Sequence, residues 1–133
     1  ELVSTESIPK TILSLAGVHV GQAMIGEELQ QLLSGAPEGR ENQVFAQISE
    51  SRVGRCIRTP EYLYSVYAPD ADGFKVPAAN KYADDFLYDM QKDPYQLHNL
   101  IQDPAYAQQK QQLRKRLLDW IEQAEGYRPE ITD

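Results

Sequence analysis

Apolar residues recur at helical spacing near the start of the chain, at Ile8, Ile12 and Leu15. Positions i, i+4 and i+7 share one face of a helix, so the pattern predicts a helix over residues 7–16, and Gly17 is placed to end it in a left-handed conformation. Three further leucines predict a second, short helix over residues 27–34. Two glutamates in its expected first turn favour this reading, because acids stabilise a helix N-terminus.

A longer helical pattern closes the chain. It begins after Asp103-Pro104, where the carboxylate can cap the first turn and the proline loses no hydrogen bond, and it runs to about residue 125, before Gly126. Its apolar stripe is expected to lie on a sheet and consists of Tyr106, Leu113, Leu117, Trp120, Ile121 and Ala124. Its other side is expected to face water and carries Lys110, Arg114, Lys115, Asp119 and Glu122.

Between the helical segments the pattern changes to short strands. The linker over 36–42 contains a proline and a glycine, and it marks a boundary between residues 1–36 and residues 37–133. Alternating or aromatic-rich runs predict four strands, over 44–49, 55–59, 62–67 and 85–89. The predicted fold class is α+β: a small four-stranded antiparallel sheet packed against a long C-terminal helix, preceded by two short helices. A loop over 68–81 has no period, and loops of this length are usually functional or mobile.

The most specific stretch joins the last predicted strand to the terminal helix. Asp93-Pro94 repeats the Asp-Pro start and Gln96 completes a capping box, so a short helical turn is predicted over 94–100. The stretch resembles the C-terminal signature of the sulfatase family, which reads LYDL..DP.E..NL and ends in a Leu-x-x-Trp-like helix. The matching residues are Leu87-Tyr88-Asp89-Met90, Lys92-Asp93-Pro94, Leu97, Asn99-Leu100, Asp103-Pro104-Ala105-Tyr106 and Leu117-Leu118-Asp119-Trp120.

Other segments are similar to the same family. Residues 3–18 resemble its VS..D..PT.L.LAG segment, residues 26–33 its G.SL..LL stretch and residues 55–59 its R.IRT strand. The sequence departs from the family pattern at Ser7, Lys10 and Leu63. The likeness covers nearly the whole chain but only the last part of a sulfatase. It implies that the first 36 residues are a helical segment from the junction with a missing catalytic domain, and that the rest is a sulfatase C-terminal subdomain.

The resemblance also implies a parent enzyme that hydrolyses sulfate esters, of a sulfated carbohydrate or a choline-like ester. Such enzymes convert a Cys or Ser within C/S-x-P-x-R to formylglycine, beside a calcium ion held by Asp and Asn ligands. Cys56 lacks this context, because Arg58 and Pro60 hold the two motif positions in reverse order. We therefore expect the chain to be inert alone, to hold no cofactor, and to have the N-terminal catalytic domain of its own parent chain as its partner.

Composition narrows the range of partners. The chain has 13 Lys and Arg against 20 Asp and Glu, and this net charge of −7 disfavours nucleic acid or an anionic membrane as partner. No run approaches the roughly 20 apolar residues of a membrane helix. The single cysteine allows no internal disulfide. The chain opens without Met or a signal-like segment, so we expect a piece of a longer protein, and the family's frequent export suggests a periplasmic or extracellular location.

Four cations are candidate substrate-adjacent residues: Arg55, Arg58, Lys75 and Lys81. The two arginines lie on opposite faces of one predicted strand, and either could bind a sulfate or a sugar carboxylate with two parallel hydrogen bonds. The two lysines lie in the long loop, a region that in sulfatases can overhang the active site. The alternative for the arginines is a surface ion pair with Glu50, Glu61 or a carboxylate of the parent domain.

A metal site within the chain is not expected. Asp70 and Asp72 with Gly73 could suggest a calcium loop, but the spaced ligands and the distal Glu of an EF-hand are missing, so a polar turn is predicted. His19 and His98 are each isolated, whereas metal sites need clustered ligands.

Two other classes of function stay open. The chain could be a free-standing interaction module that binds a protein through its first helix or its long loop, or it could be a relative of phosphodiesterases and phosphatases. The apolar face of the first helix should be under-buried in the isolated chain, or covered by a second copy through self-association of residues 8–16, because an apolar patch of several hundred Å² rarely stays bare.

Overall fold

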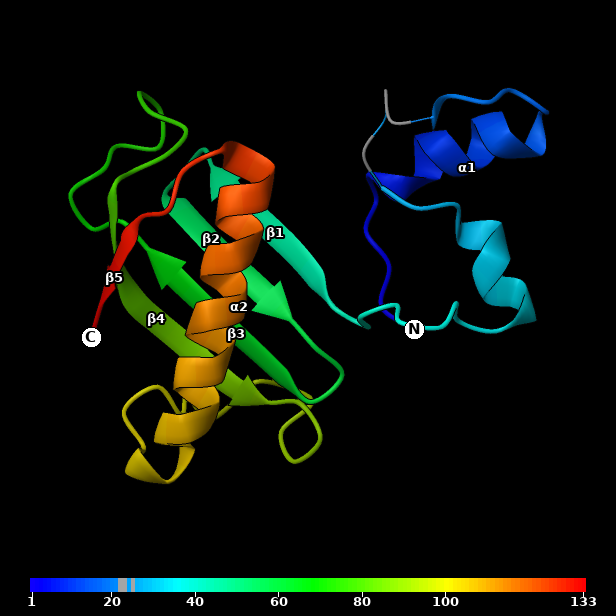
Figure 1. Ribbon diagram of the computed structural model, residues 1–133. Coiled ribbons are helices and arrows are strands. Elements are labelled where there is room, and N and C mark those ends of the chain that lie inside the picture. Colours follow the sequence, from blue (N-terminus) through cyan, green and yellow to red (C-terminus); the bar gives the residue numbers. More distant parts are fainter. Residues whose placement is uncertain (22–23, 25) are drawn as a thin grey trace. The chain divides into compact units, whose positions relative to one another are not determined.

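The computed structural model describes residues 1–21, 24 and 26–133, and the chain within it forms two compact units, 1–44 and 45–133 (Figure 1). The boundary expected from the sequence was the linker just before the first strand.

The first unit is built on helix α1 (Ser7–Leu15) and the 3₁₀ helix η2 (Leu29–Ser34). The predicted first helix is confirmed, whereas the second is a 3₁₀ helix that begins two residues later than expected. Its start is satisfied by α1 side chains: the backbone N–H of Leu29 donates to Thr11 Oγ1 at 2.9 Å, and that of Glu27 donates to Ser7 Oγ at 3.1 Å. Ser7, which departs from the family pattern, thus joins the two segments of this unit.

The apolar face of α1 is uncovered. Ile8, Ile12 and Leu15 are 47%, 60% and 70% exposed, in agreement with the expected under-burial of this face. By contrast, the polar side of α1 makes the contacts within the unit, since Ser14 Oγ donates to Glu28 at 2.9 Å and Lys10 donates to the Gly26 carbonyl at 3.1 Å.

The second unit contains a five-stranded sheet in the order β1-β2-β3-β4-β5. The strands are β1 (Val44–Ser49), β2 (Val53–Arg58), β3 (Tyr62–Tyr67), β4 (Lys81–Asp89) and β5 (Glu130–Thr132). Strands β2, β3 and β4 pair antiparallel, and β5 pairs parallel with the start of β4. The predicted four strands are all present, but β2 begins at Val53 rather than at residue 55, and β4 begins at Lys81 rather than at residue 85, so Lys81 lies in a strand and not in the long loop. The prediction of four strands missed a fifth, β5, which is only three residues long and too short to show a period.

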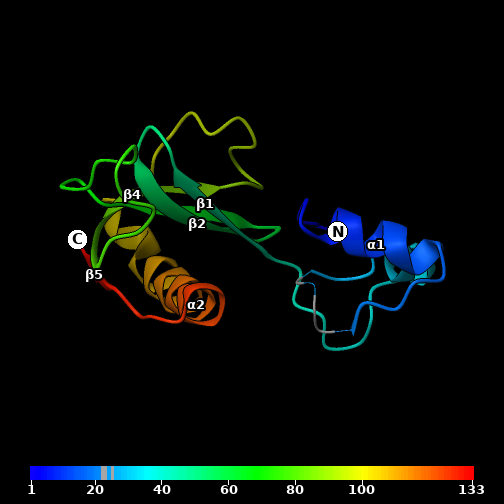
Figure 2. The same ribbon diagram turned by 90° about the horizontal axis from the view of Figure 1, so that it is seen from above.

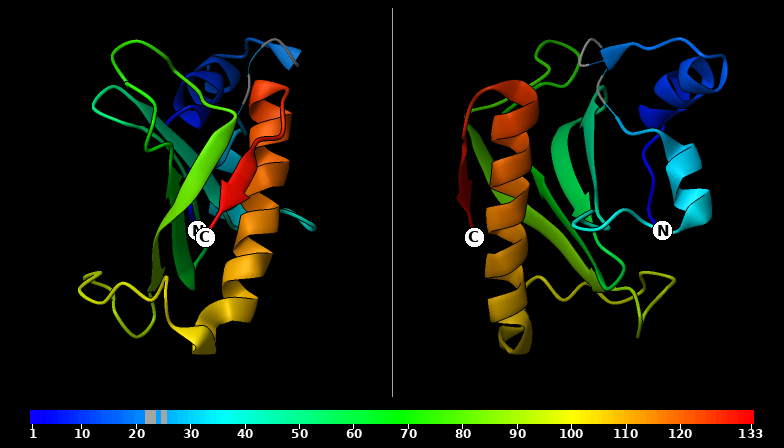
Figure 3. Two further views of the ribbon diagram at one scale, coloured as in Figure 1. Left: turned by 90° about the vertical axis from the view of Figure 1, so that its left-hand side faces the viewer. Right: turned by 45° about the vertical axis from the view of Figure 1, so that its right-hand side comes forward.

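Helix α2 (Ala107–Glu125), preceded by the 3₁₀ turn η3 (Pro104–Tyr106), covers one face of the sheet (Figures 1 and 2). The predicted cap is confirmed, because the Ala105 N–H donates to Asp103 Oδ1 at 2.9 Å, and Gly126 ends the helix in a left-handed conformation with φ 75°. The two sides of the helix and the sheet beneath it can be followed in Figure 3. The core beneath α2 consists of Val53, Ile57, Tyr64, Val66, Ala68, Tyr82, Leu87, Ile101, Leu113, Leu117 and Ile121.

One side of α2 differs from the expectation. Lys110 and Arg114 were expected to face water, but both reach back to Asp84 of β4, each at 2.9 Å from Oδ2. The Asp84 side chain is 1% exposed and also accepts from the Tyr64 hydroxyl at 2.6 Å. The long alkyl parts of the two cations cover apolar surface while their charged ends meet a buried carboxylate.

The segment between β4 and η3 contains no helix, so the helical turn predicted over 94–100 is wrong. Gln96 has φ 58°, which interrupts any helix there, and Asp93 Oδ2 accepts from the His98 N–H at 2.8 Å instead of capping a first turn. Asn99 Oδ1 accepts from the N–H groups of Leu87 and Ile101, at 3.0 and 3.1 Å. The polar residues of the family signature therefore fix this connection against β4.

Candidate functional site

The two arginines of β2 lie on opposite faces of the sheet, as the alternation predicts. Arg55 points to the face that α2 covers and its side chain is 1% exposed. It pairs with Glu125 at the end of α2, at 2.6 Å and 2.9 Å, rather than with Glu50 or Glu61. Although burial alone would lower the pKa of Arg55, the hydrogen bonds to Glu125 raise it, so the guanidinium stays charged inside the unit.

The face opposite α2 carries a hollow of about 220 Å³, here called the open-face hollow. Its lining includes Ile48, Arg52, Cys56, Ser65, Asp85 and Phe86. An irregularity in the β3–β4 register at Ser65/Val66 lets the consecutive residues Asp85 and Phe86 both line it, while Asp84 turns toward α2. The hollow thus combines a charged pair with apolar and small polar walls.

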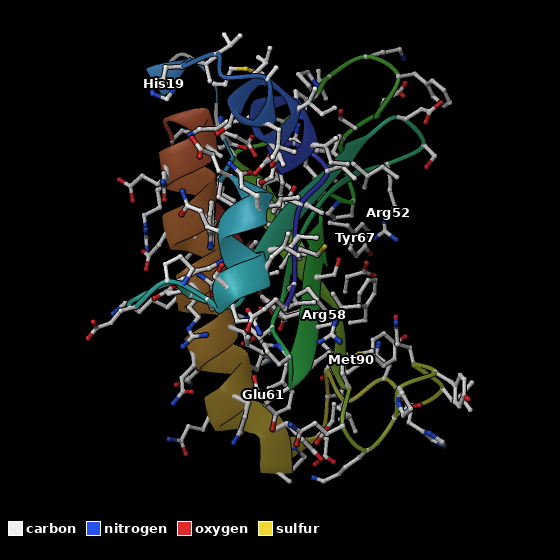
Figure 4. All side chains as sticks on the ribbon, turned by 90° about the vertical axis from the view of Figure 1, so that its right-hand side faces the viewer. His19, Arg52, Arg58, Glu61, Tyr67 and Met90 are labelled. Carbon is white, nitrogen blue, oxygen red and sulfur yellow. The ribbon has the colours of Figure 1, made fainter. Side chains whose placement is uncertain are left out.

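Arg52 is a partly exposed cation of this hollow, and no sequence pattern pointed to it because it lies in a predicted turn. Its guanidinium is 2.8 Å from Asp85 Oδ2 and 4.5 Å from the centre of the Tyr67 ring. In Figure 4 Arg52 and Tyr67 lie side by side. Its side chain is 42% exposed, so it keeps surface available for a further contact.

Arg58 lies at the other end of β2, toward Met90 and away from Arg52 (Figure 4). Its guanidinium donates to the Thr59 carbonyl and to the Tyr62 carbonyl, the latter at 3.4 Å, and burial lowers its pKa. Part of the Arg58 guanidinium is therefore already hydrogen-bonded to the turn between β2 and β3.

The two candidate lysines lie elsewhere. The Lys75 side chain is 79% exposed and pairs with Asp72 at 2.9 Å in the β3–β4 loop, residues 68–80. Lys81 is the exposed first residue of β4. The structure therefore brings no two of the four predicted cations together, and each remains an individual candidate.

Cys56 lines the open-face hollow and is half-buried. Burial raises the pKa of its thiol, which lowers the fraction of reactive thiolate. Its neighbours on the strand, Arg55 and Ile57, are packed under α2, and the proline and arginine of C/S-x-P-x-R are not at their required positions. The residues present do not fit the formylglycine site of a sulfatase.

The described residues also do not fit a metal centre. Asp72 Oδ1 accepts from the Phe74 N–H at 3.0 Å, which makes the predicted polar turn. His19 is exposed, and His98 has Asp93 as its neighbour at 3.7 Å. Within residues 1–21, 24 and 26–133, no three His, Cys, Asp or Glu residues cluster in a way that could hold a metal ion. Among the same residues, no helix has the length and apolar character needed to cross a bilayer.

Comparison with known proteins decides the family. The sequence model described as "N-sulphoglucosamine sulphohydrolase, C-terminal" matches residues 1–123. The chain belongs to this sulfatase C-terminal family. It is similar to an ulvan-active sulfatase of Formosa agariphila, with 24% identity over 91% of this chain and 29% of that protein.

Two solved structures share the fold of this sulfatase C-terminal region. One is of a protein in complex with its substrate D-glucosamine-2-N,6-O-disulfate, with a TM-score of 0.74 and 21% identity over 92% of this chain and 24% of that chain. The other, from Bacteroides thetaiotaomicron and assigned to the sulfatases, has a TM-score of 0.66 and 28% identity over 86% of this chain and 23% of that chain. The chain thus spans less than a third of the length of each of these relatives.

Proposed function

We propose that this chain is the C-terminal subdomain of an enzyme that hydrolyses sulfate esters, and that it supports and borders a catalytic centre located elsewhere in the same protein. The observation that carries the proposal is the family match over residues 1–123 to a region that is C-terminal in sulfatases. The chain covers less than a third of each of these relatives, which supports the proposal that the catalytic centre lies in another part of the protein.

The chemistry of the chain agrees with a supporting role. Its cysteine is half-buried with a raised thiol pKa, and it lies outside the motif that sulfatases convert to formylglycine. We infer that the formylglycine and the calcium ion are held by the catalytic domain. The chain by itself is inert, and its contribution is to place surfaces next to that domain.

Two surfaces are suited to that contact. The apolar face of α1 is bare and needs a cover, which we assign to the catalytic domain. The open sheet face offers the hollow with its Arg52–Asp85 pair, and an arginine near the rim of an interface can also meet an anionic group. Arg58, Lys75 and Lys81 are proposed to lie next to the substrate as single cations, whereas Arg55 acts from inside the unit.

The substrate class that we propose is a sulfated carbohydrate. The support is that one relative is an ulvan-active sulfatase and another was solved with D-glucosamine-2-N,6-O-disulfate as its substrate. The net charge of −7 works against an anionic substrate, so in this proposal individual cations such as Arg58, Lys75 and Lys81 must meet the sulfate groups.

The test is an assay of the full-length gene product with an aryl sulfate, with D-glucosamine-2-N,6-O-disulfate and with an aryl phosphate. We expect sulfate release from the sulfate esters, with kcat changed less than about twofold by Cys56→Ala, because Cys56 lies outside the C/S-x-P-x-R motif and its thiol pKa is raised. Preference for the phosphate ester would favour the phosphatase alternative. No turnover of any ester by a folded full-length protein would favour the free-standing interaction module.

A further inference from the structure

The β3–β4 loop has the length of a mobile segment, yet polar contacts fix it at its base. Arg55 donates to the Pro77 carbonyl at 2.9 Å, and the Ala79 N–H donates to the Tyr82 hydroxyl at 3.2 Å. The Tyr127 hydroxyl donates to the Ala79 carbonyl at 3.1 Å. Three side chains, from β2, β4 and the segment after α2, therefore hold Pro77 and Ala79 at the stem of the loop.

Arg55 is at the centre of these contacts and all of its donors are used. Besides Pro77, it binds both oxygens of Glu125 and the carbonyls of Gly54 and Ile48, at 2.8 and 3.4 Å. A carboxylate at a helix C-terminus is disfavoured by the helix dipole, so the guanidinium offsets an unfavourable position of Glu125. Arg55 thus connects the end of α2, strand β2 and the stem of the loop through buried contacts.

The two tyrosines close a second ring next to the arginine. Their hydroxyls are 3.2 Å apart, and each bonds one backbone group of Ala79. The Arg55 guanidinium lies 5.8 Å from the centre of the Tyr82 ring, so the ring also faces the cation. Burial and the hydrogen bond to Tyr82 raise the pKa of Tyr127, which keeps its hydroxyl protonated as a donor.

The far part of the loop is held by packing. A Cβ added at Gly73 would lie 2.5 Å from the backbone carbonyl oxygen of Glu50 and 2.9 Å from the backbone nitrogen of Arg52, so the glycine lies against the turn between β1 and β2. Between this contact and the stem, Phe74 is 80% exposed. The loop thus presents an aromatic ring and the neighbouring Lys75 from a fixed base.

We infer that Arg55, Glu125, Tyr82 and Tyr127 form a clamp that makes the β3–β4 loop a fixed arm, so that Arg55 is a positioning residue for Phe74 and Lys75 rather than a substrate contact. An arm that is already ordered loses less conformational entropy when it binds. The clamp itself does not depend on what the arm contacts. Its consequence for substrate binding rests on the proposed function.

The test compares two arginines that each pair with a carboxylate between the sheet and α2. Arg55→Met removes the clamp, whereas Arg114→Met breaks the Asp84 pair and touches no part of the loop. Hydrogen exchange followed by NMR reports the amides of Val76, which donates to Asp72, and of Ala79. We expect both to exchange at least about tenfold faster in Arg55→Met and within about twofold of wild type in Arg114→Met.

A second variant covers the case in which Arg55→Met fails to fold. Tyr127→Phe removes one hydroxyl, and we expect it to speed exchange of the Ala79 amide while core amides of β3 are unchanged. Loop amides that already exchange freely in the wild type, or that respond equally to Arg114→Met, would overturn the inference.

The activity readout is separate from exchange. In the full-length enzyme, Tyr127→Phe is expected to raise KM for a sulfated sugar while kcat is retained, because the arm would bind substrate without touching the reacting atoms. A variant with a faster-exchanging loop and an unchanged KM would overturn the positioning role of the clamp. A full-length protein without sulfatase activity would contradict the proposed function and leave the exchange result in place.

Discussion

Replacing Asp84 with asparagine should lower the free energy of unfolding of the second unit by about 3 kcal/mol. The variant keeps the shape of the side chain and an acceptor for the Tyr64 hydroxyl, but it removes the charge that meets Lys110 and Arg114. The exposed Asp133 still contacts both cations, so the loss should lie at the lower end of the range for a broken buried pair.

Asp85→Asn is the matched control. Asp85 is the next residue and also pairs with an arginine at 2.8 Å, but on the open sheet face where Arg52 is 42% exposed. We expect it to cost less than about 1 kcal/mol. The measurement is urea unfolding followed by fluorescence of Trp120, the single tryptophan, which stacks on Phe45. Equal losses in the two variants would mean that the α2-side network is no more buried in solution than the open face.

Leu117→Ala should destabilise the same unit by about 3 kcal/mol, within the usual span of about 2–5 kcal/mol for a buried leucine. Leu117 is fully buried under α2 at the centre of the helix stripe. The substitution removes apolar contacts and leaves a cavity that the rigid sheet cannot fill.

Leu97→Ala is the comparison for this effect, since Leu97 is 74% exposed in the connection after β4. The expected change is below about 0.5 kcal/mol by the same urea titration. A small loss for Leu117→Ala would show that α2 does not pack on the sheet through its predicted stripe.

Local sequence patterns were sufficient to predict α2, the capping roles of Asp103 and Gly126 and the presence of four strands, because each is set by residues close in sequence. They did not predict that β4 begins as early as Lys81. The orientation of Asp84 and Asp85 was not predictable in the same way. It depends on the irregular register between β3 and β4, which moves one acid under the helix and the other to the open face. The contacts of Lys110 and Arg114 with Asp84 follow from that register, so the sequence pattern of α2 alone predicted that both residues face water.

The connection after β4 shows a second limit. An Asp-Pro pair with a capping residue is a good local signal for a helix start, and at Asp103 it is one. At Asp93 the same signal is overridden, because Asn99 draws the chain against β4 through Leu87 and Asp85. Candidate site residues were limited by long-range pairing as well: the sequence could not tell that Arg55 meets Glu125, 70 positions later.

The most direct test of the central claim is the rate of aryl sulfate hydrolysis by the chain of residues 1–133 alone, compared with an equal concentration of the full-length gene product. The account predicts turnover by the full-length protein and none above the buffer rate by the chain. Turnover above the buffer rate by the purified chain would contradict it, whether or not that turnover persists after Cys56→Ser, because the chain would then carry catalytic groups of its own.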